Sequence, residues 1–135
     1  MAFTQHLTRR WEGIGEMIDC RQSFEGDGEL SPREVVVPPS TTDKLVNLAI
    51  DVSQLKYIYL KSDQDLTFET NDSDAPEHPV GNTIELKAGN PYIWHTGYYY
   101  TNLLTVDVTK VYLTNASGTL TATLEIRGVE DATPE

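Results

Sequence analysis

The chain lacks the residues that would build a disulfide-stapled, membrane-spanning or nucleic-acid-binding protein. Its 135 residues include one cysteine, Cys20, which excludes a disulfide within the chain and has no neighbours at a metal-site spacing. No apolar run approaches the roughly 20 residues that a membrane-spanning helix needs. Ten basic residues stand against 21 acidic ones, and the net charge of -11 disfavours contact with a phosphate backbone. We therefore expect neither a nucleic-acid partner nor a membrane.

Helical periodicity is also missing, and short segments of alternating apolar and polar residues take its place. These segments are residues 46–50, 58–60, 66–68, 84–86, 111–113 and 120–126. A period of two is typical of half-buried strands, and the segments are rich in β-branched and aromatic residues. The absence of crossover helices excludes a parallel α/β fold. We predict an all-β protein, an antiparallel β-sandwich or jelly roll with an N-terminal arm or hairpin.

Two stretches of the sequence nearly repeat each other. Residues 51–69 contain Asp-Val-Ser, Ile-Tyr-Leu and Leu-Thr-Phe, and residues 107–126 contain Asp-Val-Thr, Val-Tyr-Leu and Leu-Thr-Ala in the same order. A polar turn interrupts each copy, so each predicts one β-hairpin. Because aspartate favours the N-cap position, residues 51–54 and 107–110 each predict one helical turn.

The composition divides the chain into three parts. Residues 1–43 have sparse apolar residues, two possible strands (3–11 and 16–24) and a glycine turn, and they predict an N-terminal arm or edge hairpin. Residues 44–129 carry the clean alternation of a β-sandwich core, and residues 130–135 form an acidic flexible tail. We expect the arm to contact a neighbouring subunit.

No pattern in the sequence indicates catalysis. The histidines, His6, His78 and His95, do not have a zinc spacing, and there is no Gly-x-Ser-x-Gly nucleophile elbow. We therefore assign no catalytic, cofactor-binding or metal-binding residues, expect no cofactor, and predict that the protein is not an enzyme.

Acidic residues gather in and before a long loop at residues 71–81. They are Asp63, Asp65, Asp72, Asp74 and Glu77. Calcium takes several oxygen ligands from such loops, but the spacing is not that of a helix-loop-helix calcium site. A solvated, charged loop is the preferred interpretation.

Six aromatic and imidazole side chains lie within nine residues, at Tyr92, Trp94, His95, Tyr98, Tyr99 and Tyr100. On an alternating strand Tyr92 and Trp94 share one face, and Ile93 and His95 share the other. Two interpretations remain open: a contact surface for a subunit or a glycan, or a core tryptophan with tyrosines that cover a sheet edge. The predicted interface residues are Trp11, Tyr92, Trp94, Tyr98, Tyr99 and Tyr100.

The stretch from Asp43 to Arg127 resembles small virion proteins of tailed bacteriophages. The phrases that carry the resemblance are Leu48–Leu55, Leu60–Asn71, Ile84–Gly89 followed by Ile93–His95, and Leu113–Gly118 followed by Ala122–Arg127. They contain no mechanistic motif.

The resemblance implies a non-enzymatic structural protein that decorates or cements a phage head and is assembled in the bacterial cytoplasm. Its partners would be the major capsid protein or other virion subunits, and its own copies in an oligomer, with a trimer favoured. Two alternatives remain open. One is a tail or fibre-attachment component, and the other is a calcium-stabilised carbohydrate-binding module with Trp94, Tyr98 and Tyr99 stacked on sugars.

Overall fold

The structure, a computed structural model, describes residues 3–13, 16–26, 28–71 and 81–131. For residues 3, 10–13 and 16–20 it describes the backbone alone. The described chain is almost entirely antiparallel strand, with one 3₁₀ turn, η1 (Val52–Gln54). The strands are β1 (Phe3–Gly13), β2 (Glu16–Gly26), β3 (Gly28–Glu29), β4 (Glu34–Val37), β5 (Thr41–Val46), β6 (Leu55–Ser62), β7 (Leu66–Thr70), β8 (Thr83–Leu86), β9 (Tyr92–His95), β10 (Val111–Asn115) and β11 (Ala122–Glu130).

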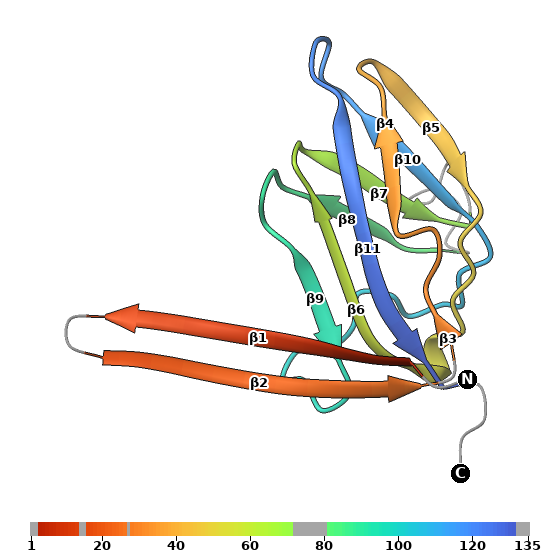
Figure 1. Cartoon of the computed structure of the whole chain (residues 1–135). Coiled ribbons are helices and arrows are strands. Elements are labelled where there is room, and N and C mark those ends of the chain that lie inside the picture. The colour runs from red at the N-terminus through yellow and green to blue at the C-terminus, as the bar shows by residue number, and fades with distance from the viewer. Residues whose placement is uncertain (1–2, 14–15, 27, 72–80, 132–135) are drawn as a thin grey trace.

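Two sheets face each other, and a separate two-stranded hairpin, β1–β2, projects from them (Figure 1). One sheet has the order β5-β10-β7-β8, and the other has the order β3-β11-β6-β9, with β4 also paired to β11. Counted from β4, the strands are ordered 1-8-3-6 in one sheet and 2-7-4-5 in the other. This is the order of an eight-stranded jelly roll. The predicted fold class is therefore confirmed.

The core lies between the sheets and is built from the residues that alternate in the sequence. Ile58, Leu60, Phe68, Leu113 and Leu124 are completely buried. Their neighbours along each strand lie on the outer faces and are mostly half-buried or exposed, because successive side chains of a strand point to opposite sides. The predicted inward set is thus confirmed on all the central strands.

The two copies of the near-repeat do not form hairpins, and this prediction was wrong. In the first copy β6 and β7 lie in different sheets, and in the second copy β10 and β11 do the same. Each copy pairs with the other: β6 with β11 at Leu60 and Ile126, and β7 with β10 at Phe68 and Leu113. A polar turn sets the direction of the chain but does not decide whether the next strand pairs with the last or crosses to the facing sheet.

The aspartates that open the two copies have different roles. Asp51 caps η1, where its side chain accepts a hydrogen bond from the Ser53 amide, so this predicted turn is confirmed. Residues 107–110 are not helical; Val108 pairs with Ile50, and Asp107 Oδ1 accepts from the Val52 amide at 2.9 Å. The second copy therefore supports the helical turn of the first instead of forming its own.

The hairpin is shorter than the arm that the composition suggested. β3 and β4 precede residue 44 and β5 begins before it, yet these strands pair with β11 and β10 and belong to the sandwich. The boundary therefore falls near Gly26, where the hairpin crosses β11. A Cβ at Gly26 would lie 2.1 Å from the Glu130 carbonyl oxygen, so only glycine allows this close approach.

Asn115 joins three parts of the sandwich at the end of β10. Its Nδ2 donates to the carbonyl oxygens of Val37, Pro38 and Leu120 at 3.1, 3.3 and 2.8 Å. Its Oδ1 accepts from the Ser117 amide at 3.1 Å. Because Asn115 is completely buried, it satisfies backbone groups that water cannot reach.

We expect Asn115→Leu to lower the free energy of unfolding by about 2–3 kcal/mol, because it leaves buried backbone groups without partners. The control is Asn47→Leu at an exposed position, which should change that free energy by no more than about 0.5 kcal/mol. Urea unfolding followed by circular dichroism measures both. Equal midpoints for the two variants would contradict the role given to Asn115.

Candidate functional site

The hairpin is fixed at its base to the outer face of the sheet that contains β6, β9 and β11. Leu7 and Phe24 are buried against Tyr57, and the rings of Phe24 and Tyr57 stack with centroids 5.1 Å apart. Tyr57 belongs to the outward set of β6, yet it is only 4% exposed because the hairpin covers it. A part of the sheet that would face water is thus a second, smaller hydrophobic core.

The hairpin has two different faces. In an antiparallel pair, residues that lie opposite each other share a face. Leu7 lies opposite Gln22, and Phe24 opposite Gln5; we call this side, which packs on the sandwich, the inner face. The other side is polar and exposed at Thr4, His6, Thr8, Arg21, Ser23 and Glu25.

The inner face continues beyond the sandwich. Trp11 and Ile18 lie opposite each other in the hairpin register and belong to this face by the two-residue period. Trp11 is four residues beyond Leu7, which corresponds to about 13 Å along an extended strand. Figure 1 shows the hairpin running across the sheet and extending well past β9. The distal half of the hairpin is thus a projecting arm, and Trp11 and Ile18 lie on its inner face between the pairs Arg9–Cys20 and Gly13–Glu16.

A series of rings leads from the base of the hairpin to the surface. The ring centroids of Phe24 and His95 are 5.0 Å apart, and those of His95 and Tyr98 are 4.7 Å apart. The ring of Tyr98 meets that of Tyr100 edge-on, with centroids 5.5 Å apart. Such offset and edge-to-face contacts are the favoured geometries of aromatic pairs. The hairpin, β9 and the loop after β9 are thereby held as one unit.

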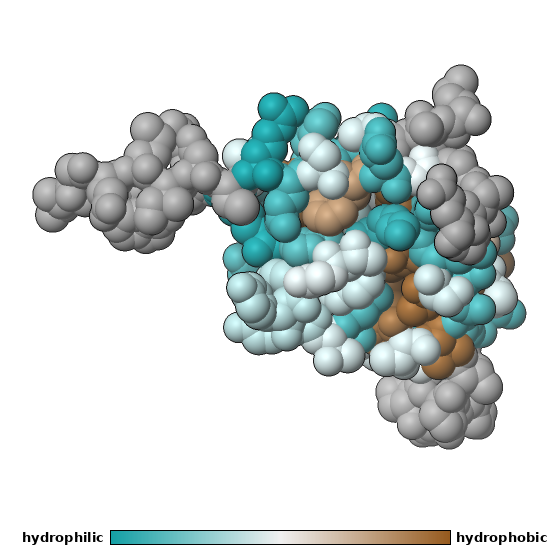
Figure 2. All heavy atoms as spheres, turned by 90° about the horizontal axis from the view of Figure 1, so that it is seen from below, coloured by the Kyte–Doolittle hydropathy of each residue, from teal (hydrophilic) through white to brown (hydrophobic). Residues whose placement is uncertain are grey.

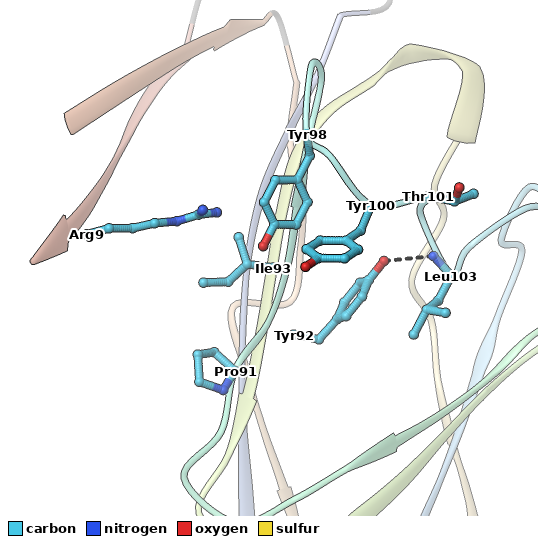
Figure 3. Close-up of a pocket in the computed structure, with 8 residues that line it drawn as sticks. All are labelled: Arg9, Pro91, Tyr92, Ile93, Tyr98, Tyr100, Thr101 and Leu103. Carbon is cyan, nitrogen blue, oxygen red and sulfur yellow. Dashed lines mark hydrogen bonds between the residues drawn. The ribbon is translucent and has the colours of Figure 1, made fainter. Parts of the chain in front are cut away.

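A groove of about 710 Å³ opens beside this series, under the point where the arm leaves the sandwich. In Figure 3 the guanidinium of Arg9 reaches toward Tyr98, and the rings of Tyr92, Tyr98 and Tyr100 gather beside it. The Arg9 carbon Cζ lies 4.8 Å from the Tyr98 ring centroid, a cation–π contact. The groove is lined by Arg9, Pro91, Tyr92, Ile93, Tyr98, Tyr100, Thr101 and Leu103.

Hydrogen bonds within the loop after β9 hold the wall of the groove in place. The Tyr92 hydroxyl donates to Asn102 Oδ1 at 2.5 Å. It accepts from the Leu103 amide at 2.8 Å, the hydrogen bond drawn in Figure 3. Asn102 Oδ1 also accepts from the Leu104 amide. Burial raises the pKa of Tyr92, so the hydroxyl keeps its proton for these contacts. The loop therefore presents the side chain of Leu103 in a fixed place.

Exposed hydrophobic residues gather on the loop between β9 and β10. Among the described residues, four of the seven exposed large hydrophobic side chains belong to residues 99–106: Tyr99, Tyr100, Leu103 and Val106. Figure 2 shows the underside of the molecule, where hydrophobic residues reach the surface in separate areas among polar ones. Clusters of exposed apolar residues are typical of interaction sites.

The structure assigns different positions to the predicted interface residues. Tyr92 and Trp94 share one face, as predicted, and pack against the main core. Tyr98 is half-buried, whereas Tyr99 and Tyr100 are 97% and 72% exposed. The side chain of Trp11 is outside the part that the structure describes. Ile93 and His95 face the hairpin, where His95 is 4% exposed.

Sequence reasoning missed Arg9, Phe24, Tyr57 and Leu103. Arg9 is charged, Phe24 and Tyr57 were assigned to separate elements, and Leu103 lies in a loop without periodicity. One signal was available: a two-residue period read along both strands of the hairpin places Arg9 with Leu7 and Trp11 on the apolar side.

Two of the acidic residues accept hydrogen bonds from the backbone of distant segments. Asp63 Oδ1 accepts from the Thr123 amide and Asp65 Oδ1 from the Ala88 amide, at 2.8 and 2.9 Å. Asp72, Asp74, Glu77 and His78 lie outside the described residues. Within the described ranges there is no group of three side chains that could hold a metal ion, and no helix is long and apolar enough to cross a membrane.

Comparison of the chain with protein-family models, with curated proteins and with solved structures gives no match. The argument for function therefore depends on the geometry of the hairpin and the groove.

Burial and, to a smaller extent, the nearby Tyr59 together raise the pKa of Tyr57 from 10 to about 12, against a lowering by Arg127 and Arg9. Because the unfolded chain ionises this phenol near pH 10, the stability that the neutral form contributes is complete below pH 10. It is lost as the pH rises through about 12.

We expect Tyr57 and Tyr92 to titrate later than the exposed tyrosines, and Tyr57→Phe to lower the size of the absorbance change near pH 12. Near-ultraviolet absorbance of tyrosinate measures this change. The control is Tyr99→Phe, an almost fully exposed ring, which should leave the late change at its full size. A change near pH 12 of undiminished size in Tyr57→Phe would contradict the burial of Tyr57 by the hairpin.

Proposed function

We propose that this protein is a non-enzymatic structural protein of a virion, a decoration or cement protein that docks as an oligomer on the major capsid lattice. The observation that carries the proposal is the projecting hairpin. Its inner face is bound to Tyr57 at the base and continues past the edge of the sandwich at Trp11 and Ile18.

An isolated two-stranded hairpin is marginally stable in water. The proximal half of this hairpin packs on the sandwich, whereas the distal half extends beyond it (Figure 1). An apolar strand pair held out from a folded body fits a contact between subunits, where another protein covers it. In a symmetric lattice many such contacts act together, so that a modest affinity at each arm is sufficient.

The rest of the molecule supports the same proposal. Jelly rolls recur in viral capsid proteins, although lectins also use them. The phrases that resemble phage virion proteins include segments of β6, β7, β8, β9, β10 and β11, so this resemblance concerns the scaffold. The acidic chain suits docking on a basic surface. A tail or fibre-attachment component would use the same features.

The carbohydrate-binding alternative has less support from the geometry. Of its three predicted stacking rings, Trp94 packs against the core, and Tyr98 contacts His95, Tyr100 and Arg9. Tyr99 alone is almost fully exposed. A sugar platform needs flat rings with an open face, and only one of the three is freely available.

The test is to purify intact particles of the virus that encodes this chain and to locate the protein by cryo-electron microscopy. We expect density for the jelly roll at regular positions on the head, with the hairpin in contact with a neighbouring subunit. A protein that is absent from purified particles would overturn the proposal, and density on the tail would replace the head assignment.

A shortened hairpin tests the arm itself. Because Leu7 and Gln22 are opposite each other, an Asn-Gly turn can replace residues 8–21 and leave the Leu7–Phe24 anchor in place. We expect this variant to fold and to lose at least about tenfold in affinity for particles that lack the protein, since the lost contacts include aromatic anchors. Thr8→Ala on the exposed polar face is the control. Co-sedimentation measures binding, and equal binding by all three proteins would contradict the role of the arm.

A further inference from the structure

We infer that the partner of the arm includes a second copy of this chain, and that the inner face of one copy's arm docks in the tyrosine groove of the next. The tyrosine groove is the groove lined by Arg9, Pro91, Tyr92, Ile93, Tyr98, Tyr100, Thr101 and Leu103. The inference deepens the proposed function and rests on its oligomeric part alone.

The two surfaces match in chemistry. The groove is aromatic and aliphatic apart from Arg9 and Thr101, and Leu103 and Tyr100 on its wall are 52% and 72% exposed. The arm offers Trp11 and Ile18 on its inner face. Aromatic residues packed in an apolar pocket are the usual energetic centre of a protein interface. Each copy carries both surfaces, so arms and grooves can pair in a closed ring or a reciprocal dimer.

Charge favours the arm over the sandwich as the place where two copies of this chain meet. Residues 3–26 contain three arginines and four acidic residues, a net charge of -1, and the remaining residues carry the other -10. Two copies of such an acidic protein repel each other wherever their sandwiches meet. The nearly neutral arm is the part of the chain that can approach a second copy with the least repulsion. A basic partner would instead be drawn to the sandwich.

Position also favours this pairing. The groove lies in the corner where the arm leaves the sandwich, and Arg9 of the arm forms part of its wall. A guest in this corner contacts both the host's groove and the host's arm. Nη2 of Arg9 is buried and has no hydrogen-bond partner among the described residues, so a carbonyl or carboxylate of the guest would satisfy it.

The first test compares two matched substitutions by light scattering after size exclusion. Leu103 in the groove and Leu120 in a distant turn have nearly equal exposure, 52% and 53%. Each is replaced by aspartate in a separate variant. We expect the wild type and Leu120→Asp to have a multiple of the 15.1 kDa chain mass. Leu103→Asp should weaken association at least about tenfold, because it places a charge in the interface core. Circular dichroism checks that both variants fold.

The second test asks whether the arm pairs with the groove. Trp11→Asp damages the arm and Leu103→Asp damages the groove, so each variant alone should be mainly monomeric. A mixture leaves one intact arm and one intact groove, and we expect its average mass to rise above that of either variant.

Three results would overturn the inference: a monomeric wild type at high concentration, equal masses for Leu103→Asp and Leu120→Asp, or no recovery in the mixture. These results are separate from those for the proposed function. A monomer that binds particles would overturn the inference and the oligomeric part of the proposed function but not the role in the virion, and an arm-linked oligomer that is absent from particles would overturn that role alone.

Discussion

The stack of Phe24 on Tyr57 is the interaction on which the functional surface depends. It holds the hairpin against the outer face of the sheet and buries a residue that would otherwise face water. Because the hairpin is fixed there, Arg9 lies over Tyr98 and the groove has its upper wall. Without this stack the hairpin would be an isolated two-stranded ribbon of marginal stability, and its inner face would have no fixed orientation relative to the sheet. This ring contact thus fixes the position of the hairpin on the sheet.

The sandwich below the hairpin gains its stability from the pairing between the two copies of the near-repeat. β6 and β7 of one copy meet β11 and β10 of the other, so the central strands of both sheets come from these copies. Both copies place most of their apolar residues in the core, although Leu120 is exposed and the polar Asn115 is buried. The repeat therefore builds the scaffold, and the contact surface lies outside it, in the hairpin and in the loop after β9.

Most of the acidic charge and most of the described interaction surface lie in different parts of the molecule. The sandwich and its loops carry nearly all of the net negative charge, and the hairpin carries almost none. In the proposed assembly, charge keeps the acidic bodies of neighbouring molecules apart, and the nearly neutral arm makes the contact between them. This division suits a protein that stays soluble before assembly and binds through a limited contact afterwards.

The sequence by itself determined the fold class, because a two-residue period has one structural meaning when it recurs in short segments separated by turns. It also determined that Tyr92 and Trp94 share one face of β9, but not that this face packs on the core, where the structure places both. It did not determine which strands pair, since the same turn composition joins paired strands in a hairpin and unpaired strands at a corner between sheets. Only the tertiary structure brought Arg9 and Leu103 to one groove, and Phe24 onto Tyr57, from distant positions that no local pattern connects. Packing of the hairpin across the sheet decided the site, because a contact between two distant segments depends on the shape of the whole fold.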